Sequence, residues 1–491
     1  MVLARVAFLI GVILRWFGAA LLVPAAVAAF DANRTEVIAF VVSAAASTGV
    51  GVLFRQIGEA PADLRRPDAL AVVAFTYVAI ALAGALPFLL VGLSFMDALF
   101  ESMSGLTTTG GTVLTDFARY GRGVHFWRAL SHWLGGIGVI TLFVAVLPKL
   151  AIGGRELFFA EASGPTDEAL TPQIRKTAAA LWRVYTALTA AAVVALLIAG
   201  MPLYDAIVHA FATVAAGGFS PHPQSVMGYH LPAVEWTLTF FMFLAGANFA
   251  LHYRALFRPS TRIFRDEELV YYAGIVVLAS ATIAGLLVTK GGHSVADAVR
   301  LATFQVVSVI TSTGFATADF ATWDDRSRLL LLALMFVGGC AGSAAGGLKI
   351  VRVLLITRYA LQELRRTLHP RAVMPVKLSG RVVPEPVMRA VLVFFLYYLL
   401  AFVLCAAIVT AAEGDIAIGV TGAIASLANA GPGFGPIGPM GSYAGLTAVS
   451  KFVLVMAMWL GRLELMTALV FLGPRVWQDV RWRSRPPPVV S

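Results

Sequence analysis

The stretch Thr107-Thr108-Thr109-Gly110-Gly111 interrupts an otherwise apolar chain with a short polar segment that contains glycine. Three comparable segments follow it: Ala215-Ala216-Gly217-Gly218-Phe219, Thr311-Ser312-Thr313-Gly314-Phe315 and Asn429-Ala430-Gly431-Pro432-Gly433. Each comes after a short apolar stretch that opens near an aspartate, and we match Gly110, Gly217, Gly314 and Gly431 with one another. This correspondence predicts that one structural unit occurs four times in a single polypeptide.

Glycine-containing segments without regular secondary structure occur in few places within a membrane protein. Lipid cannot satisfy free backbone carbonyls, so such segments survive at membrane depth only where they are buried in protein or line an aqueous path. Glycine permits the angles that turn successive carbonyls in one direction, and carbonyl oxygens replace the hydration shell of a cation. One such run could be a helix-packing motif, but four of them, each between two long apolar segments, favour a cation filter.

The composition indicates an integral membrane protein. Of the 491 residues, 59% are hydrophobic and only 13% are charged, and the mean hydropathy is +0.82, which is far from the values of a soluble domain. A helix that crosses a membrane needs about 20 apolar residues. By this criterion we expect ten spans, at about 3–29, 36–54, 69–93, 124–148, 177–200, 232–256, 269–289, 327–357, 385–411 and 443–472.

The basic residues set the orientation of these spans. The net charge is +10, but lysine and arginine alternate between loops and form no single patch, so nucleic acid is not an expected partner. Basic clusters follow the second, fourth, sixth and eighth spans and close the chain, and by the positive-inside rule these faces are cytoplasmic. Both termini are therefore predicted inside and the four glycine loops outside. Arg5 before an apolar run also fits a signal peptide, but the interior Arg15 favours a retained helix.

These features together predict an all-α integral membrane protein of ten transmembrane helices, with four pseudo-symmetric helix–pore loop–helix repeats around a central ion pore. The short helices are expected to begin at Asp97, Asp205, Asp297 and Asp415, where an acidic cap satisfies free amide donors. Their carbonyl ends then favour a cation. We divide the chain into two helices outside the pore (1–66) and four repeats, at 67–160, 161–264, 265–375 and 376–491. The two cysteines lie in apolar segments and predict no disulfide framework.

Several motifs resemble a known family. The four loops look like the pore loops of the Trk/Ktr/HKT superfamily of potassium transporters. Further stretches are similar to its TrkH-like membrane subunits: Trp133-Leu134-Gly135-Gly136-Ile137-Gly138, Glu161-Ala162-Ser163-Gly164-Pro165, the run from Gly338 to Lys349, and Gly461-Arg462-Leu463-Glu464. The resemblance covers nearly the whole chain. It implies potassium uptake across a bacterial cytoplasmic (inner) membrane, a homodimer, and gating by a cytoplasmic TrkA-like ring subunit that binds nucleotide, with no cofactor in this chain.

The resemblance also assigns residues to the filter. Carried over position by position, the potassium ligands are the backbone carbonyls of Thr108, Thr109, Gly110, Ala215, Ala216, Gly217, Ser312, Thr313, Gly314, Asn429, Ala430 and Gly431. Gly110 favours potassium, because serine at that place is associated with sodium-conducting relatives. The chain departs from the usual second loop, in which Ser-Thr precedes the paired glycines, because two alanines occupy those places. Their backbone carbonyls remain, so coordination of the ion is still expected.

A second glycine-rich segment lies within the predicted span 327–357. Glycine in a helix interior costs up to about 1 kcal/mol relative to alanine, so this segment predicts a break in the helix. The resemblance makes the broken segment a gate below the filter. Arg462 lies inside the last span, where an arginine costs roughly 2.5 to 3.5 kcal/mol, and we expect it to bind carbonyls of the broken segment; the alternative is a packing role with Glu464. The predicted gate residues are Gly338, Gly339, Gly342, Ser343, Gly346, Gly347 and Arg462. Lys349 and Arg352, just beyond the glycines, are interpreted as interfacial anchors; the alternative is that they touch the gate.

Other functions are compatible with parts of the sequence. A sodium-coupled or weakly selective cation conductance of the Ktr kind differs in coupling more than in motifs. A membrane-embedded enzyme needs clustered His, Asp or Glu, and His125, His132, His209 and His252 have neither a paired carboxylate nor an HExxH motif. We therefore do not expect an enzyme, and a pure scaffold gives no reason for four glycine loops. The basic segment 358–389 fits both anionic lipid headgroups and an acidic regulatory protein.

Overall fold

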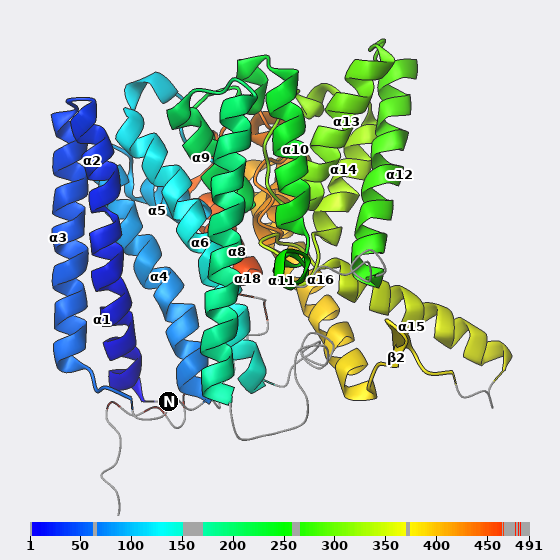
Figure 1. Cartoon of the computed structure of the whole chain (residues 1–491), viewed down its shortest axis with the longest axis horizontal. Helices are drawn as coiled ribbons and strands as arrows, with labels where there is room; N and C mark the ends of the chain where they lie inside the picture. The colour runs from blue at the N-terminus through cyan, green and yellow to red at the C-terminus, as the bar shows by residue number, and fades with distance from the viewer. Residues whose placement is uncertain are drawn as a thin grey trace, which may run out of the picture.

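The structure is a computed structural model, and it describes residues 2–61, 66–150, 170–257, 266–369 and 374–463 together with Leu465, Trp477, Val480 and Trp482. This part of the chain is almost entirely helical (Figure 1). One antiparallel hairpin, made by β1 (Lys377–Leu378) and β2 (Arg381–Val382), accompanies the helices. The chain therefore belongs to the all-α class that its composition predicts.

Two helical segments precede the glycine loops. α1 (Leu3–Ala20) continues into α2 (Leu22–Phe30) as one apolar span, and α3 (Arg34–Ile57) packs beside it at one edge of the bundle (Figure 1). Glycine permits the close contact, because a Cβ atom on Gly11 would lie 2.6 Å from the carbonyl oxygen of Gly51. Small residues of this kind let the backbones of membrane helices approach one another.

The remaining helices form four successive units, each with a long helix, a short helix and a closing part. The first unit is α4 (Arg66–Leu90), α5 (Phe95–Leu106) and α6 (Arg122–Leu150). The second is α8 (Leu170–Ile198), α9 (Leu203–Val214), α10 (Pro232–Gly246) and α11 (Phe249–Phe257). The third is α12 (Glu267–Thr289), α13 (Val295–Ile310), α14 (Asp325–Val337) and α15 (Ile350–Leu368). The fourth is α16 (Glu385–Glu413), α17 (Ile416–Leu427) and α18 (Ala448–Arg462).

The short helices connect these units in a cyclic order. α5, α9, α13 and α17 pack against the long helices of their own units, which are α4, α8, α12 and α16. Each also packs against a closing helix of the preceding unit: α9 on α6, α13 on α10, α17 on α14, and α5 on α18. The last contact brings the fourth unit back to the first. The glycine loops, which follow the short helices, are therefore held near one another.

The described residues confirm part of the set of ten spans that the sequence predicts. In the described part of the chain six helices are long and apolar enough to cross a membrane, or seven if one bent pair is counted. The bent pair is α10 and α11, which meet at 104° where the sequence predicts the continuous span 232–256. The predicted span 327–357 is divided into α14 and α15. The predicted continuation of the last span from 463 to 472 lies almost wholly outside the described residues.

The short helices do not all begin as predicted. The hydroxyl of Ser94 accepts the N–H of Asp97 (3.3 Å) and donates to its carboxylate (2.7 Å). Ser294 and Asp297 repeat this capping box at the start of α13. Of the four aspartates that the sequence predicts as caps, only Asp415 is one. A serine three residues before the aspartate identifies the caps of α5 and α13, whereas α9 begins after Pro202, which makes no side-chain cap bond.

Candidate functional site

The four glycine loops share one backbone conformation. Just after each short helix a non-glycine residue lies in the left-handed region, with φ between 52° and 56°, at Thr108, Ala216, Ser312 and Asn429. Two residues later a glycine also has positive φ, between 78° and 89°, at Gly110, Gly218, Gly314 and Gly431. Non-glycine residues seldom adopt the left-handed region. Its recurrence at four matching places shows that the loops are built alike although their sequences differ.

One hydrogen bond fixes each loop to its own short helix. The residue between the two positive-φ positions donates its N–H to a helix carbonyl over 2.7 to 2.8 Å. The four pairs are Thr109 with Ser104, Gly217 with Ala212, Thr313 with Ser308, and Ala430 with Ala425. The identical bond gives a second, independent alignment of the four loops.

This alignment corrects the predicted register of the second loop. The sequence match pairs Gly217 with Gly110, whereas the backbone places Gly218 at that position. Ala215, predicted as a ligand, is the C-cap of α9. The prediction was wrong by one residue because two consecutive glycines occur there, and a sequence does not reveal which of them has positive φ. The structural equivalents of Thr108, Thr109 and Gly110 are Ala216, Gly217 and Gly218.

The loops contact one another in a closed ring. A Cβ atom on Gly314 would lie 2.6 Å from the carbonyl oxygen of Ala430, and one on Gly431 would lie 2.6 Å from that of Thr109. The other two contacts between loops are of the same kind: a Cβ atom on Gly110 would meet the carbonyl oxygen of Gly217, and one on Gly218 would meet that of Thr313. We call these four contacts the joints of the ring. Each glycine thus lies against a carbonyl of the next loop, and the fourth loop meets the first. Positive φ and this carbonyl together exclude a side chain at all four glycines.

The backbone conformation of the ring repeats in all four loops, whereas one side-chain hydrogen bond repeats in only two of them. In the first loop the hydroxyls of Thr107 and Thr109 are hydrogen-bonded over 2.8 Å, and Thr311 and Thr313 repeat this bond in the third loop over 2.7 Å. The second and fourth loops have only alanine and glycine at these places. In the fourth loop Asn429 instead donates its amide to the hydroxyl of Thr109, over 2.9 Å.

A buried ion pair supports the first two loops, and sequence reasoning missed it. Arg128 of α6 donates from Nε to Glu101 of α5 (2.7 Å) and from Nη1 to the carbonyl of Ser220, beyond the second loop (2.9 Å). Glu101 also accepts the N–H of Val113, beyond the first loop (2.9 Å). The two side chains are 2% and 0% exposed. The available signal was a charged residue within the predicted span 124–148.

The histidines near the ring are packed residues, as the sequence predicts. His132 lies between two units: Nδ1 is 2.8 Å from the carbonyl oxygen of Gly105, and Nε2 accepts the N–H of Phe219 over 3.2 Å. His209 Nε2 lies 3.2 Å from the hydroxyl of Ser220. Within the described ranges no three His, Cys, Asp or Glu side chains are grouped to hold a metal ion. These imidazoles therefore act as hydrogen-bonding supports of the loops.

The predicted break in the third unit is present. Residues 338–349, the glycine-rich segment, separate α14 from α15, and positive φ occurs in it at Gly338, Gly342, Gly347 and Lys349. The N–H of Gly346 donates to the hydroxyl of Ser312 in the third loop, over 2.6 Å. The glycine-rich segment therefore lies directly against the ring.

The glycine-rich segment also closes the bend between α10 and α11. The N–H of Cys340 donates to the carbonyl of Gly246, which the bend leaves without a helical partner (2.9 Å). In return the carbonyl of Gly342 accepts the N–H of Phe249, the first residue of α11 (3.1 Å). Two breaks in different helices thus satisfy each other's backbone groups, as burial in a membrane requires.

The other predicted residues of this segment pack closely. A Cβ atom on Gly339 would lie 2.9 Å from the carbonyl oxygen of Gly246, and one on Gly346 would meet the carbonyl of Ala428. Ser343 donates its hydroxyl to the carbonyl of Cys340 (2.6 Å). The segment is therefore an ordered part of the core.

Arg462 of α18 contacts the glycine-rich segment. Its Nη1 donates to the carbonyl of Ala344 over 3.0 Å, and the residue is 4% exposed. This is the type of contact that the sequence predicts for Arg462. The alternative partner, Glu464, lies outside the described residues.

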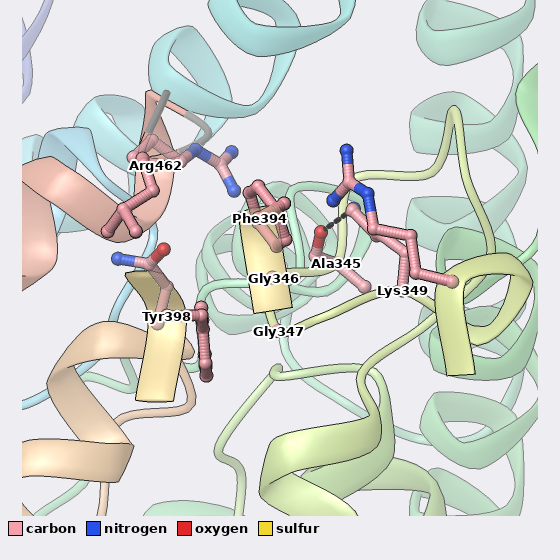
Figure 2. A pocket seen from close by; sticks show the side chains of 11 residues that line it. Ala345, Gly346, Gly347, Lys349, Phe394, Tyr398 and Arg462 are labelled. Atoms are coloured by element: carbon pink, nitrogen blue, oxygen red, sulfur yellow. Dashed lines mark hydrogen bonds between the residues drawn. The ribbon is translucent and has the colours of Figure 1, made fainter. Parts of the chain in front are cut away.

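A second cation, Lys349, is the last residue of the segment itself. Lys349 is buried, and its Nζ donates to the carbonyl of Ala345, so it is not the interfacial anchor that the sequence predicts. Both cations line one pocket, with Phe394 and Tyr398 of α16. In Figure 2 the segment at Ala345 lies between Arg462 and Lys349. Arg352 lines the same pocket, so three basic side chains face the space beside the segment.

A second pocket lies at the glycine ends of the loops. The first pocket reaches Asn429, which begins the fourth loop, whereas the second is lined by the ends of the loops, at Gly110, Gly218, Gly314 and Pro432. Tyr443 also lines the second pocket, and its hydroxyl donates to the carbonyl of Gly431 over 2.8 Å. The two pockets therefore touch the loops at different places: one at the start of the fourth loop and one at the glycine ends.

Comparison with known proteins places the chain in a family. The family profile TrkH, described as cation transport protein, matches residues 33–483. The chain is 38% identical over 450 residues to the Trk system potassium uptake protein TrkH of Halomonas elongata, covering 90% of this chain and 92% of that protein. It is 37% identical over 423 residues to the protein of the same name from Escherichia coli, covering 85% and 87%. The crystal structure of the potassium transporter TrkH from Vibrio parahaemolyticus is similar, with a TM-score of 0.89 and 35% identity over 97% of this chain and 100% of that one.

Glycine loops set between long apolar helices define a multi-pass membrane protein of the cation-transport class. The chain belongs to the TrkH family of cation transport proteins. The predicted resemblance to the TrkH-like members of the Trk/Ktr/HKT superfamily is therefore confirmed, and the family is one of transporters, not of enzymes. One motif that contributed to the resemblance, residues 161–165, lies outside the described residues.

Proposed function

We propose that this protein takes up potassium across the bacterial cytoplasmic membrane through the ring of glycine loops. The observation that carries the proposal is the closed contact of the loops, with the backbone carbonyls of Thr109, Gly217, Thr313 and Ala430 at its four joints. Backbone carbonyls in a ring are the ligands that replace the hydration shell of a potassium ion. The names of the relatives, Trk system potassium uptake proteins, support potassium as the ion.

The proposed ligands follow the corrected register. They are the carbonyls of three consecutive residues in each loop, at 108–110, 216–218, 312–314 and 429–431. The ion is held by the main chain, so the missing hydroxyls of the second and fourth loops leave coordination intact. The potassium ion is the transported cargo, and no nucleotide or other cofactor is proposed for this chain.

We assign the glycine-rich segment as the gate of this pathway. Its hydrogen bond to Ser312 places it beside the ring, and the charges of Arg462 and Lys349 beside it oppose a cation, because like charges repel strongly where water is scarce. Opening then requires the segment to leave the ring and the contact between Arg462 and Ala344 to break.

The partners are proposed from the sequence and from the names of the relatives. A Trk system implies further components, and a cytoplasmic TrkA-like ring that binds nucleotide would control the gate of a homodimer. The basic helix α15, which extends from the lower right of the bundle in Figure 1, suits an acidic partner or anionic lipid headgroups. Both termini are placed on the cytoplasmic side by the positive-inside rule.

Uptake of radioactive rubidium into proteoliposomes tests the filter. Excess potassium, but not sodium, should block the uptake. The Gly110→Ser variant should weaken this discrimination, because Gly110 has φ of 83° and lies against the carbonyl of Gly217. Equal competition by sodium in the unmodified protein would overturn the potassium assignment. Uptake that requires sodium would favour a coupled transporter of the Ktr kind.

Arg462→Ala tests the gate in the same vesicles. Loss of the cation and of its hydrogen bond to Ala344 should raise the uptake rate, and so should a shortened glycine-rich segment. Unchanged uptake in both variants would remove the segment as a gate while leaving the filter proposal intact.

A further inference from the structure

Glu268 of α12 bridges the two sides of the broken helix. Its Oε1 accepts the N–H of Ala341 over 2.6 Å and the N–H of Val351 over 3.2 Å. Ala341 lies near the start of the glycine-rich segment, and Val351 lies in the first turn of α15. A single carboxylate oxygen therefore holds together two backbone positions that the break would otherwise leave independent.

The local structure of α12 fixes this carboxylate. Asp266 is the N-cap of the helix and accepts the N–H of Leu269 over 2.9 Å, which orders the first turn. The neighbouring Glu267 reaches α15, where it pairs with Arg358 over 2.9 Å. The first turn of α12 thus contacts the glycine-rich segment through one carboxylate and α15 through the other.

The remaining side-chain contacts of the segment are of a different kind. Ser312 and Arg462 hold its middle, at Gly346 and Ala344, and both belong to elements next to the ion path. Glu268 lies on the long helix of the third unit, and it contacts Ala341 near the start of the segment and Val351 just beyond its end. Both N–H groups share one oxygen of Glu268, so this side chain sets the distance between the two sides of the break.

We propose that Glu268 is a positioning residue that ties the ends of the glycine-rich segment together, and that release of its two hydrogen bonds is a step in opening. The inference rests on the proposed gate. When Ala341 and Val351 separate, the glycines at positive φ allow the segment to change direction without steric cost. The segment then withdraws from Ser312 and the ring.

The two native cysteines allow a test that does not depend on ion flux. Cys340 precedes Ala341 and is fully buried, and Cys405 is the other cysteine of the chain. In a Cys405→Ala background, the rate at which a small maleimide modifies Cys340 in the full-length protein in liposomes reports the exposure of the segment. Glu268→Gln keeps the shape of the side chain but replaces the charged acceptor with a neutral one.

Labelling of Cys340 should be about fivefold faster in Glu268→Gln than in the parent protein. Glu268→Asp keeps the charge and shortens its reach, so its labelling rate should fall between the two. Glu267→Gln is the matched control, because its carboxylate contacts Arg358 and not the segment, and its labelling should be unchanged. A labelling rate in Glu268→Asp that lies nearer to that of the parent protein would show that the two hydrogen bonds, and not general unfolding, control the exposure of Cys340.

An unchanged labelling rate in Glu268→Gln overturns the proposal, and so does equal acceleration in the Glu267→Gln control. Where labelling accelerates as expected, rubidium uptake in the same vesicles should rise by a similar factor with the preference for potassium retained. Faster labelling without faster uptake would confirm the tie and overturn the gate, so the failure of one proposal is distinguishable from the failure of the other.

Discussion

The ring of glycine loops and the glycine-rich segment are both irregular backbone inside a helical bundle, but different contacts hold them. In the ring, each glycine lies against the carbonyl of the next loop, so backbone holds backbone through all four units. The glycine-rich segment shares backbone hydrogen bonds with the bend after Gly246, and single side chains hold it as well: Ser312 of the third loop, Arg462 of α18 and Glu268 of α12. Glycine excludes side chains in the first region and permits a change of direction in the second. The ring, which must keep its dimensions, and the glycine-rich segment, which must move, can therefore both be rich in glycine.

Removal of one partner of the buried pair beside the ring should have the largest effect. In Arg128→Gln the Glu101 carboxylate stays buried without its cation, and such a loss costs about 3–5 kcal/mol. We expect a lower unfolding temperature of the purified protein and a weaker preference for potassium over sodium. Arg389→Gln is the control, because Arg389 and Glu385 are 76% and 82% exposed, and it should change stability by less than about 0.5 kcal/mol. Equal unfolding temperatures for the two variants would show that the ring is not braced in this way.

Gly218→Ala tests whether contacts between backbone groups hold the ring. Positive φ costs an alanine roughly 1–2 kcal/mol, and its Cβ atom would also collide with the carbonyl of Thr313. Rubidium uptake should fall at least about tenfold, because 1.4 kcal/mol is a factor of ten. In Gly285→Ala the new methyl group meets no atom within 4 Å, so uptake should be preserved. Normal uptake in Gly218→Ala would favour the register that the sequence predicts.

Ser312→Ala tests the hydrogen bond between the two regions. The variant removes the acceptor of the Gly346 N–H but leaves the ring backbone unchanged. A neutral hydrogen bond contributes about 1 kcal/mol, so uptake without any regulatory subunit should rise about fivefold with selectivity retained. Thr282→Ala removes an exposed hydroxyl that bonds only to its own helix and serves as the control. A change in selectivity without a change in rate would mean that the hydroxyl of Ser312 serves the filter and not the gate contact.

Tyr443→Phe should give the smallest effect. It removes the hydrogen bond to the carbonyl of Gly431 and retains the ring that packs on Phe100. Because Tyr443 lines the pocket at the ends of the loops, water replaces the lost donor at little cost. We expect less than about a twofold change in competition by sodium, measured by rubidium uptake. A larger change in sodium competition would show that the loop ends at this pocket are held as rigidly as the joints of the ring.

Local signals explain what the sequence predicted correctly. The helical class follows from long apolar runs, and the break before α15 follows from five glycines within ten residues, from Gly338 to Gly347. The contact between Arg462 and the broken segment followed from a charge that needs acceptors inside a membrane. The bend after Gly246 was missed because the partner of its free carbonyl, Cys340, lies far away in the chain. The bridge at Glu268 was missed for the same reason.

The sequence by itself determined that this protein spans a membrane, because hydropathy is a sum over neighbouring residues. It also indicated the positions of the four glycine loops and of the broken helix, which local composition reveals. Only the tertiary structure decided which glycine of the second loop takes positive φ, which carbonyl lies against it, and which carboxylate joins the ends of the broken helix. These features depend on contacts between units that are far apart in the chain, and in a single sequence nothing local records such contacts.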